Sequence, residues 1–166
     1  MYNIDEYVIH ITGGICRIED ITSLNMSGAD KNRTYYLLTP IKAYSSKAYV
    51  PTDNDSTIRK IITKEEALSL IDEIPSIPEM EIENEKQREN KYKEVLKSCD
   101  LRMLISVMKN LQNRKSKRLA EGKKNTATDD KYYKLAEESL YSELAFVLGK
   151  DKSEMQSLVF ERIILE

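Results

Sequence analysis

The chain has 166 residues, of which 33% are charged and 40% hydrophobic, and its formal net charge is -2. This composition is typical of a globular protein with one ordinary domain or two small ones. It excludes a membrane-spanning protein, because no apolar run approaches the roughly 18 residues that a span requires. Two distant cysteines and an opening without a hydrophobic signal stretch favour the cytoplasm over secretion and disulfide bonding.

The near-neutral charge hides a strong segregation along the chain. Acidic residues dominate residues 65–89, whereas basic residues dominate 101–124, where Glu121 is the one acid. A chain of this kind can present one positive surface, and it is the local field that attracts phosphates. The alternative is a solvated helix face that binds nothing.

The N-terminal part predicts strands. Short β-branched or aromatic runs are separated by Gly, Asn, Asp, Ser and Pro, which is the pattern of a small antiparallel barrel. Residues 22–33 include SGADKN and predict a hairpin loop. The predicted strands are 7–11, 15–21, 34–38 and 48–50.

After Thr63 the apolar period changes from two to about 3.6, which indicates helices. Thr63 and Glu66 form a capping box that opens the helix KEEALSLIDEI, and Pro75 and Pro78 stop it. A charged helix is expected from about Glu83 to Ser98. Further helices are expected to begin near Asp100, at Thr126 or Thr128, and at Asp151, with Gly122 and Gly149 at the two intervening ends.

The fold class that follows is α+β, with a mainly β N-terminal part and an all-α C-terminal part. We expect a small antiparallel β-barrel in residues 1–62. A compact helical domain of about five helices is expected in residues 63–166.

The residues of catalysis and metal binding are sparse. The single histidine, His10, lies inside a predicted strand, which is a poor place for the base of a Ser-His-acid triad. His10, Cys16 and Cys99 lack the short paired spacing of a zinc site. Gly13-Gly14 is followed by a predicted strand, whereas a phosphate loop needs further glycines and a helix. We therefore predict no catalytic residue, no metal site and no cofactor.

Several segments, in order, resemble the CarD/CdnL family of bacterial RNA-polymerase-binding regulators. The opening NIDEYVIHITGGICRIEDI is similar to the family's first two strands, and KAYVPTDN to its strand ending in V-P-x-x-N. NKYKEVLKSCD and SELAFVLG are similar to segments of the family's helices. The opening positions that match are Asp5, Val8, Ile9, Gly14, Ile18, Glu19 and Ile21.

The resemblance implies that the barrel is Tudor-like, in the SH3-like class. It makes Gly13-Gly14 a turn between strands, where glycine supplies backbone angles that other residues avoid. His10 and Cys16, which depart from the family pattern, become barrel positions.

The resemblance also implies that the barrel binds the RNA polymerase β subunit through an edge strand. Strand addition would supply main-chain hydrogen bonds, and side chains would set the register. The positions that match the family's polymerase contact are Leu24, Met26, Lys47 and Tyr49. The alternative for Tyr49 is packing inside the barrel.

For the helical domain the resemblance implies contact with promoter DNA, through its backbone and minor groove, at the upstream edge of the melted bubble. Many members insert a tryptophan there, four residues before a tyrosine that corresponds to Tyr92, but this chain has Arg88 and no tryptophan. An arginine can grip phosphate without unstacking bases. The expected DNA-binding residues are Arg88, Lys91, Lys93, Arg114 and Lys131.

These cations have another possible role, as partners of Glu85, Glu89 and Glu94 on the helix surface. In that case the chain would be an adaptor between proteins with no direct DNA contact. An enzyme with an unrecognised site is a third reading.

The sequence thus favours a non-enzymatic transcription regulator, monomeric in its working complex, without membrane contact, and associated with the nucleoid through RNA polymerase. It would modulate open-complex stability and initiation.

Overall fold

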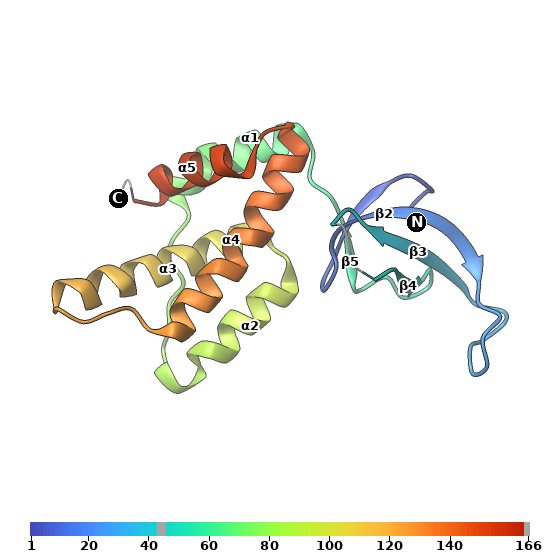
Figure 1. Cartoon of the computed structure of the whole chain (residues 1–166), viewed down its shortest axis with the longest axis horizontal. Coiled ribbons are helices and arrows are strands. Elements are labelled where there is room, and N and C mark those ends of the chain that lie inside the picture. The colour runs from blue at the N-terminus through green and yellow to red at the C-terminus, as the bar shows by residue number, and fades with distance from the viewer. Residues whose placement is uncertain (43–45, 165–166) are drawn as a thin grey trace. The chain divides into compact units, whose positions relative to one another are not determined.

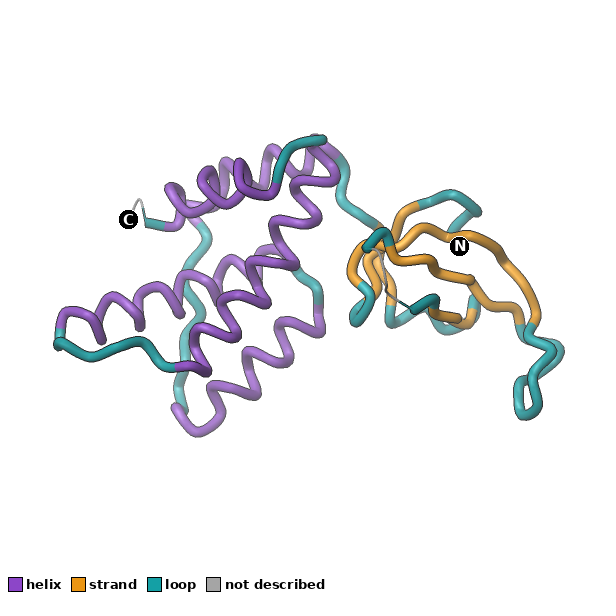
Figure 2. Tube along the Cα trace, in the orientation of Figure 1, coloured by secondary structure: helices purple, strands orange, loops and turns teal. Residues whose placement is uncertain are grey.

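A computed structural model describes residues 1–42 and 46–164 of the chain, which divides into two compact units, Met1–Ile61 and Ile62–Glu166. Strands lie in the first unit and helices in the second (Figure 2), so the expected α+β class is confirmed. The strands are β1 (Tyr7–His10), β2 (Gly14–Ser23), β3 (Thr34–Pro40), β4 (Ala48–Pro51) and β5 (Ile58–Lys60). The helices are α1 (Lys64–Glu73), α2 (Arg88–Ser98), α3 (Leu101–Ala120), α4 (Ala127–Leu148) and α5 (Lys152–Ile163), with 3₁₀ turns η1 (Ile74–Ser76) and η2 (Glu85–Gln87).

The five strands form one antiparallel sheet in the order β4-β3-β2-β1-β5, which curls into a half-barrel (Figure 1). The register between β2 and β3 shifts between Ile18 and Asp20, so that Glu19 lies in an irregularity of the ladder. Such a bulge bends the strand and increases its twist, which helps the sheet to curl. The outer strands β4 and β5 leave the sheet with two edges.

The concave side of the half-barrel is apolar. Alternation places Tyr36 and Leu38 inward, fully buried, while Tyr35 and Leu37 face the other side and are half-buried. The Tyr36 hydroxyl accepts a hydrogen bond from the Tyr2 N–H at 3.1 Å, so this buried phenol is satisfied. The buried cluster consists of Val8, Cys16, Ile18, Tyr36, Leu38, Val50 and Ile58.

Gly13 and Gly14 serve the β1–β2 turn for different reasons. Gly14 has φ +64°, a left-handed conformation that costs an ordinary L-residue about 1–2 kcal/mol. Gly13 is favoured by space, since a Cβ there would lie 3.0 Å from His10 Nδ1 and 3.2 Å from Cys16 Sγ, and these side chains would have to shift.

Strand β5 was not predicted, because the sequence indicated a linker before the first helix. Ile58–Lys60 pairs antiparallel with Val8–His10 of β1. A run of three residues is too short to show alternation, so its strand conformation is decided by the partner strand rather than by its own pattern.

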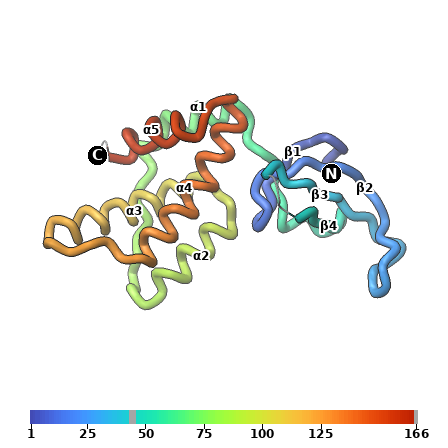
Figure 3. Tube along the Cα trace, in the orientation of Figure 1, coloured from blue at the N-terminus to red at the C-terminus, as the bar shows by residue number. Residues whose placement is uncertain are grey.

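Helix α4 is the centre of the second unit. It packs against α3, which runs beside it, and also against α5, α1 and α2 (Figure 3). Leu104, Ile105 and Met108 of α3 are at most 1% exposed, as are Leu140 and Leu144 of α4. These residues belong to the main apolar core, which fixes the positions of the helices that carry the surface side chains.

The predicted caps are largely confirmed. Thr63 and Glu66 make the predicted reciprocal capping box. The helix expected to begin near Asp100 begins at Leu101, and Asp100 caps it, since its Oδ1 accepts from the Met103 N–H at 3.0 Å. Thr126, rather than Thr128, caps α4 by accepting from the Asp129 N–H at 3.1 Å. The expected helix 83–98 is shorter than predicted, because residues 85–87 form the 3₁₀ turn η2 before α2 begins.

Candidate functional site

The β4 edge is the first candidate surface. Strand β4 is hydrogen-bonded to β3 and is the outermost strand on that side of the sheet. A strand in this position leaves backbone N–H and C=O groups available to another chain. Tyr49 lies opposite Leu37, on the face away from the barrel core, and its side chain is 46% exposed. The alternative in which Tyr49 packs inside the barrel is therefore wrong.

Lys47 stands immediately before β4 and is held by the bulge of β2. Its Nζ lies 2.6 Å from Glu19 Oε2 and 2.9 Å from Oε1, and the Thr39 hydroxyl donates to the same carboxylate. The hydrogen bond from Lys47 is the main cause that lowers the pKa of Glu19. Lys47 thus has a defined position at this edge.

Leu24 and Met26 lie in a different place from Tyr49. Both follow the end of β2 at Ser23, in the connection to β3, and Met26 is 62% exposed. Tyr49 is level with Leu37, three residues from the start of β3, which is about 10 Å along the strand. The structure therefore groups Tyr49 with Lys47 and places Leu24 and Met26 beyond the start of β3 at Thr34.

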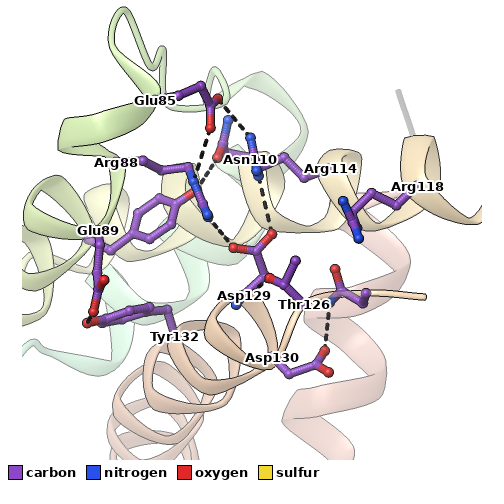
Figure 4. A network of polar contacts seen from close by, with 12 residues as sticks. Glu85, Arg88, Glu89, Asn110, Arg114, Arg118, Thr126, Asp129, Asp130 and Tyr132 are labelled. Atoms are coloured by element: carbon purple, nitrogen blue, oxygen red, sulfur yellow. Dashed lines mark hydrogen bonds and ion pairs between the residues drawn. The ribbon is translucent and has the colours of Figure 1, made fainter. Parts of the chain in front are cut away.

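The second candidate surface is built around a buried carboxylate in the helical unit (Figure 4). Asp129 lies in the first turn of α4 and has no exposed surface. Its Oδ1 accepts from Arg88 Nη1, and its Oδ2 lies 3.3 Å from Arg114 Nε. One acid thus binds two guanidinium groups, one from the start of α2 and one from α3.

Glu85 completes this network from the solvent side. Its side chain is 65% exposed, with Oε1 2.9 Å from Arg114 Nη1 and Oε2 3.3 Å from Arg88 Nε. The two arginines are far less accessible, with side chains 15% and 26% exposed for Arg88 and Arg114 respectively. We call Glu85, Arg88, Arg114 and Asp129 the arginine network.

Two tyrosines pack beneath the arginine network. The Arg88 guanidinium lies 5.5 Å from the centre of the Tyr92 ring, and the Tyr92 hydroxyl donates to Asn110 Oδ1 at 2.6 Å. The Tyr132 hydroxyl donates to Glu89 Oε1 at 2.7 Å, which is the main cause that lowers the pKa of Glu89. Burial raises the pKa of Tyr132 to about 12.

The remaining expected DNA-binding residues lie around this network. Lys93 Nζ is 3.4 Å from Glu89 Oε1, one turn earlier on α2. Lys91 is half-buried and forms no ion pair within the part of the chain that the structure describes. Lys131 is exposed, with its Nζ 5.3 Å from the centre of the Tyr132 ring.

Sequence reasoning missed Asp129 and Asn110. The signal for Asp129 was present but local, since an acid three residues after the Thr126 cap is the usual first-turn acid of a helix. That it binds two arginines from other helices depends on the packing of α2, α3 and α4, which no spacing along the chain reveals.

His10 and Cys16 are structural in their contacts. His10 Nδ1 accepts from the Gly13 N–H at 3.1 Å, which uses the lone pair that a metal would need. Burial raises the pKa of the Cys16 thiol to about 11. Within residues 1–42 and 46–164, no group of three or more His, Cys, Asp or Glu side chains is placed to hold a metal ion.

Two family models match adjoining parts of the chain. The model described as CarD-like/TRCF RID domain matches residues 2–62, and that described as CarD, C-terminal domain matches residues 60–160. The chain belongs to the CarD family. The resemblance drawn from the sequence is thereby confirmed. A search of curated protein sequences found no match.

Membership of the CarD family makes the chain a CarD-like transcription factor that interacts with RNA polymerase. The family consists of transcription regulators rather than enzymes. Among the described residues, no helix combines the length and apolar character needed to cross a membrane.

Proposed function

We propose that this CarD-family chain regulates initiation by binding the polymerase β subunit through the β4 edge and contacting promoter DNA through its helical unit. We assign docking to residues 1–62 and DNA contact to residues 63–166. The DNA contact would lie near the upstream edge of the bubble, and the protein would act as a monomer in that complex.

The observation that carries the docking half is the exposed Tyr49 on a strand with a free edge. Main-chain pairing with a strand of the partner gives affinity at such an edge, and an aromatic side chain beside it gives register. Lys47, held by its ion pair with Glu19, adds a side chain of fixed position next to the same edge. Leu24 and Met26 would contact the partner beyond the start of β3.

Docking is tested with Tyr49→Glu in the full-length protein, measured by pull-down with polymerase. We expect the variant to lose most of its polymerase binding while its circular dichroism spectrum is unchanged. Ile11→Glu is the matched control, because Ile11 is also exposed, at 38%, but lies in the β1–β2 turn. Retained binding by a folded Tyr49→Glu protein would exclude Tyr49 from the interface.

Cations without a carboxylate partner support the DNA half of the proposal. Lys91, Lys131, Lys117 and Lys124 form no ion pair among residues 1–42 and 46–164. Free lysines can neutralise phosphates without first breaking an internal pair. Lys131 also lies near the start of α4, where the helix dipole favours an anion.

The DNA contact is tested by the lifetime of the open promoter complex. Lys91→Glu with Lys131→Glu should shorten the lifetime severalfold while polymerase pull-down stays intact. Lys97→Glu with Lys150→Glu is the matched control, since it also reverses two exposed charges of the helical unit. A lifetime equal to that of the control would remove these lysines from the DNA contact.

A specific observation favours the second candidate, an adaptor without DNA contact. Arg88, Arg114 and Lys93, which the sequence assigned to DNA, all have acidic partners within the helical unit. The adaptor function is supported if DNA titrations at several salt concentrations show no binding. Phosphate contacts would instead give binding with a log-linear dependence on salt.

The expected size of the regulatory effect is modest. A regulator that binds the open complex better than the closed one shifts an existing equilibrium, and about 1.4 kcal/mol changes it tenfold. The step that limits a given promoter then decides whether the chain activates or represses it.

A further inference from the structure

The arginine network has two layers with different strengths. Asp129 is fully buried, and each of its carboxylate oxygens binds a different arginine. Removing either cation would leave one oxygen of this buried carboxylate without its partner, so this lower layer is fixed. It aligns the Arg88 and Arg114 guanidinium groups and neutralises only one of their two positive charges.

The upper layer is the exposed Glu85, which supplies the second negative charge. One of its oxygens faces each arginine, at 2.9 Å for Arg114 and 3.3 Å for Arg88. The fit to Arg88 is imperfect, because the buried Nε of Arg88 makes no hydrogen bond among the described residues. An ion pair with an exposed carboxylate contributes only about 0–1 kcal/mol, so Glu85 is easily displaced.

The position of Glu85 in the chain also favours displacement. It is the first residue of the 3₁₀ turn η2, whose N-cap is Asn84, and the Asn84 side chain accepts from the Lys86 N–H at 3.0 Å. The backbone hydrogen bonds of this turn do not involve the Glu85 carboxylate. A side-chain rotation can therefore free the two guanidinium groups without unfolding the turn.

We propose that Arg88 and Arg114 form a phosphate-binding fork for the nucleic-acid backbone, and that Glu85 occupies this fork as an internal competitor. Two oxygens of one phosphate can replace the two oxygens of Glu85, and guanidinium groups bind phosphate with directional, charge-assisted hydrogen bonds. The proposal rests on the DNA contact proposed above and adds a site and a means of limiting its affinity.

The fork explains how paired arginines can still serve a DNA contact. With Glu85 in place, the network is electrically balanced and binds free phosphate or non-specific duplex weakly. When polymerase holds the chain on a promoter, the effective local concentration of DNA phosphate is high, and phosphate displaces Glu85 from the two arginines. The competitor thus restricts the fork to DNA that is presented by the complex.

The test compares Glu85→Gln with Glu83→Gln in the full-length protein. Both variants remove one exposed acid from the same segment, but Glu83 has no ion pair in the described part of the chain. Binding of a fluorescent forked DNA is measured by anisotropy at several salt concentrations. We expect Glu85→Gln to bind about three to ten times more tightly than Glu83→Gln, as expected for loss of a competing exposed ion pair.

Arg114→Gln supplies the decisive background, with thermal melting used to verify that it folds. In that background Glu85→Gln should have no advantage over Glu83→Gln, because the fork is already incomplete. Equal DNA affinity of the two glutamine variants would overturn the fork while leaving the proposed DNA contact intact. Tighter binding of inorganic phosphate but not of DNA by Glu85→Gln would overturn the assignment to nucleic acid. Absence of DNA binding by every variant, with and without polymerase, would overturn the proposed DNA contact together with the fork.

Discussion

Replacing Asp129 with asparagine should destabilise the helical unit more than the same replacement of its exposed neighbour Asp130. The amide has the shape of the carboxylate, but it carries no charge and its nitrogen would face a guanidinium donor. Arg88 and Arg114 would then share only the exposed Glu85. The substitution therefore tests whether the buried acid holds three helices together.

The magnitude follows from burial. Removing one partner of a buried ion pair costs about 3–5 kcal/mol. The two arginines keep 15% and 26% of their side-chain exposure, so water recovers part of the loss. We therefore expect about 2–3 kcal/mol, which corresponds to roughly 5–10 °C in Tm for a chain of this length.

The assay is urea unfolding at pH 7, followed by far-UV circular dichroism. Asp130→Asn is the matched control, because Asp130 is in the same first turn and loses the same interaction with the helix dipole. Its carboxylate is exposed and accepts from Asn125 Nδ2 at 2.7 Å. If Asp129→Asn lost no more than about 0.5 kcal/mol beyond Asp130→Asn, the network would not be a structural anchor.

Three further substitutions or titrations test individual environments. Burial lowers the pKa of His10. The contribution of the neutral ring to stability is therefore present above the unfolded pKa of about 6.5 and is lost as pH falls through the folded pKa. An NMR titration of the chain's single histidine with a midpoint at or above about 6.5 would contradict this. Gly14→Ala should lower the free energy of unfolding in urea by about 1–2 kcal/mol, because φ at this position is +64°. Gly14→Asn should lower it less. Equal stability of all three proteins would contradict the left-handed turn. Burial raises the pKa of Glu137, so its contribution to stability is present below the unfolded pKa and is lost as pH rises through the folded pKa. Glu137→Gln should therefore be more stable than wild type at pH 7 and lose this advantage near pH 4, and a difference independent of pH would refute the assignment.

Local signals predicted the parts of the fold that depend on neighbouring residues. The Thr63 box, the helix start near Asp100 and the glycines at the ends of α3 and α4 require only contacts within a turn, and these predictions are confirmed. Gly122 and Gly149 have φ of 73° and 63°, as expected for glycines that end helices.

Features that depend on distant residues could not be predicted in this way. Strand β5 is defined by its pairing with β1, some fifty residues earlier. Arg88 and Asp129 are 41 residues apart. The helix-surface pairs expected from the sequence named only the nearby Glu85, Glu89 and Glu94, of which Glu85 and Glu89 are partners in the structure. A buried acid and a first-turn surface acid look the same in sequence, because burial is decided by the helices that pack over it.

Arg88 stands where the sequence resemblance places a tryptophan in many family members, which has a consequence for the DNA contact proposed for this chain. A guanidinium fixed by Asp129 and packed over Tyr92 is not free to enter a base stack. An apolar wedge acts by unstacking a base step, which costs least at flexible pyrimidine–purine steps. A contact made through phosphates has no such preference but weakens as salt rises. The proposed DNA contact therefore predicts a gain in open-complex lifetime that is the same on promoters differing only in the base step at the upstream edge, and that falls steeply with salt. A gain that depended on that step and resisted salt would show that another side chain of the chain acts as a wedge.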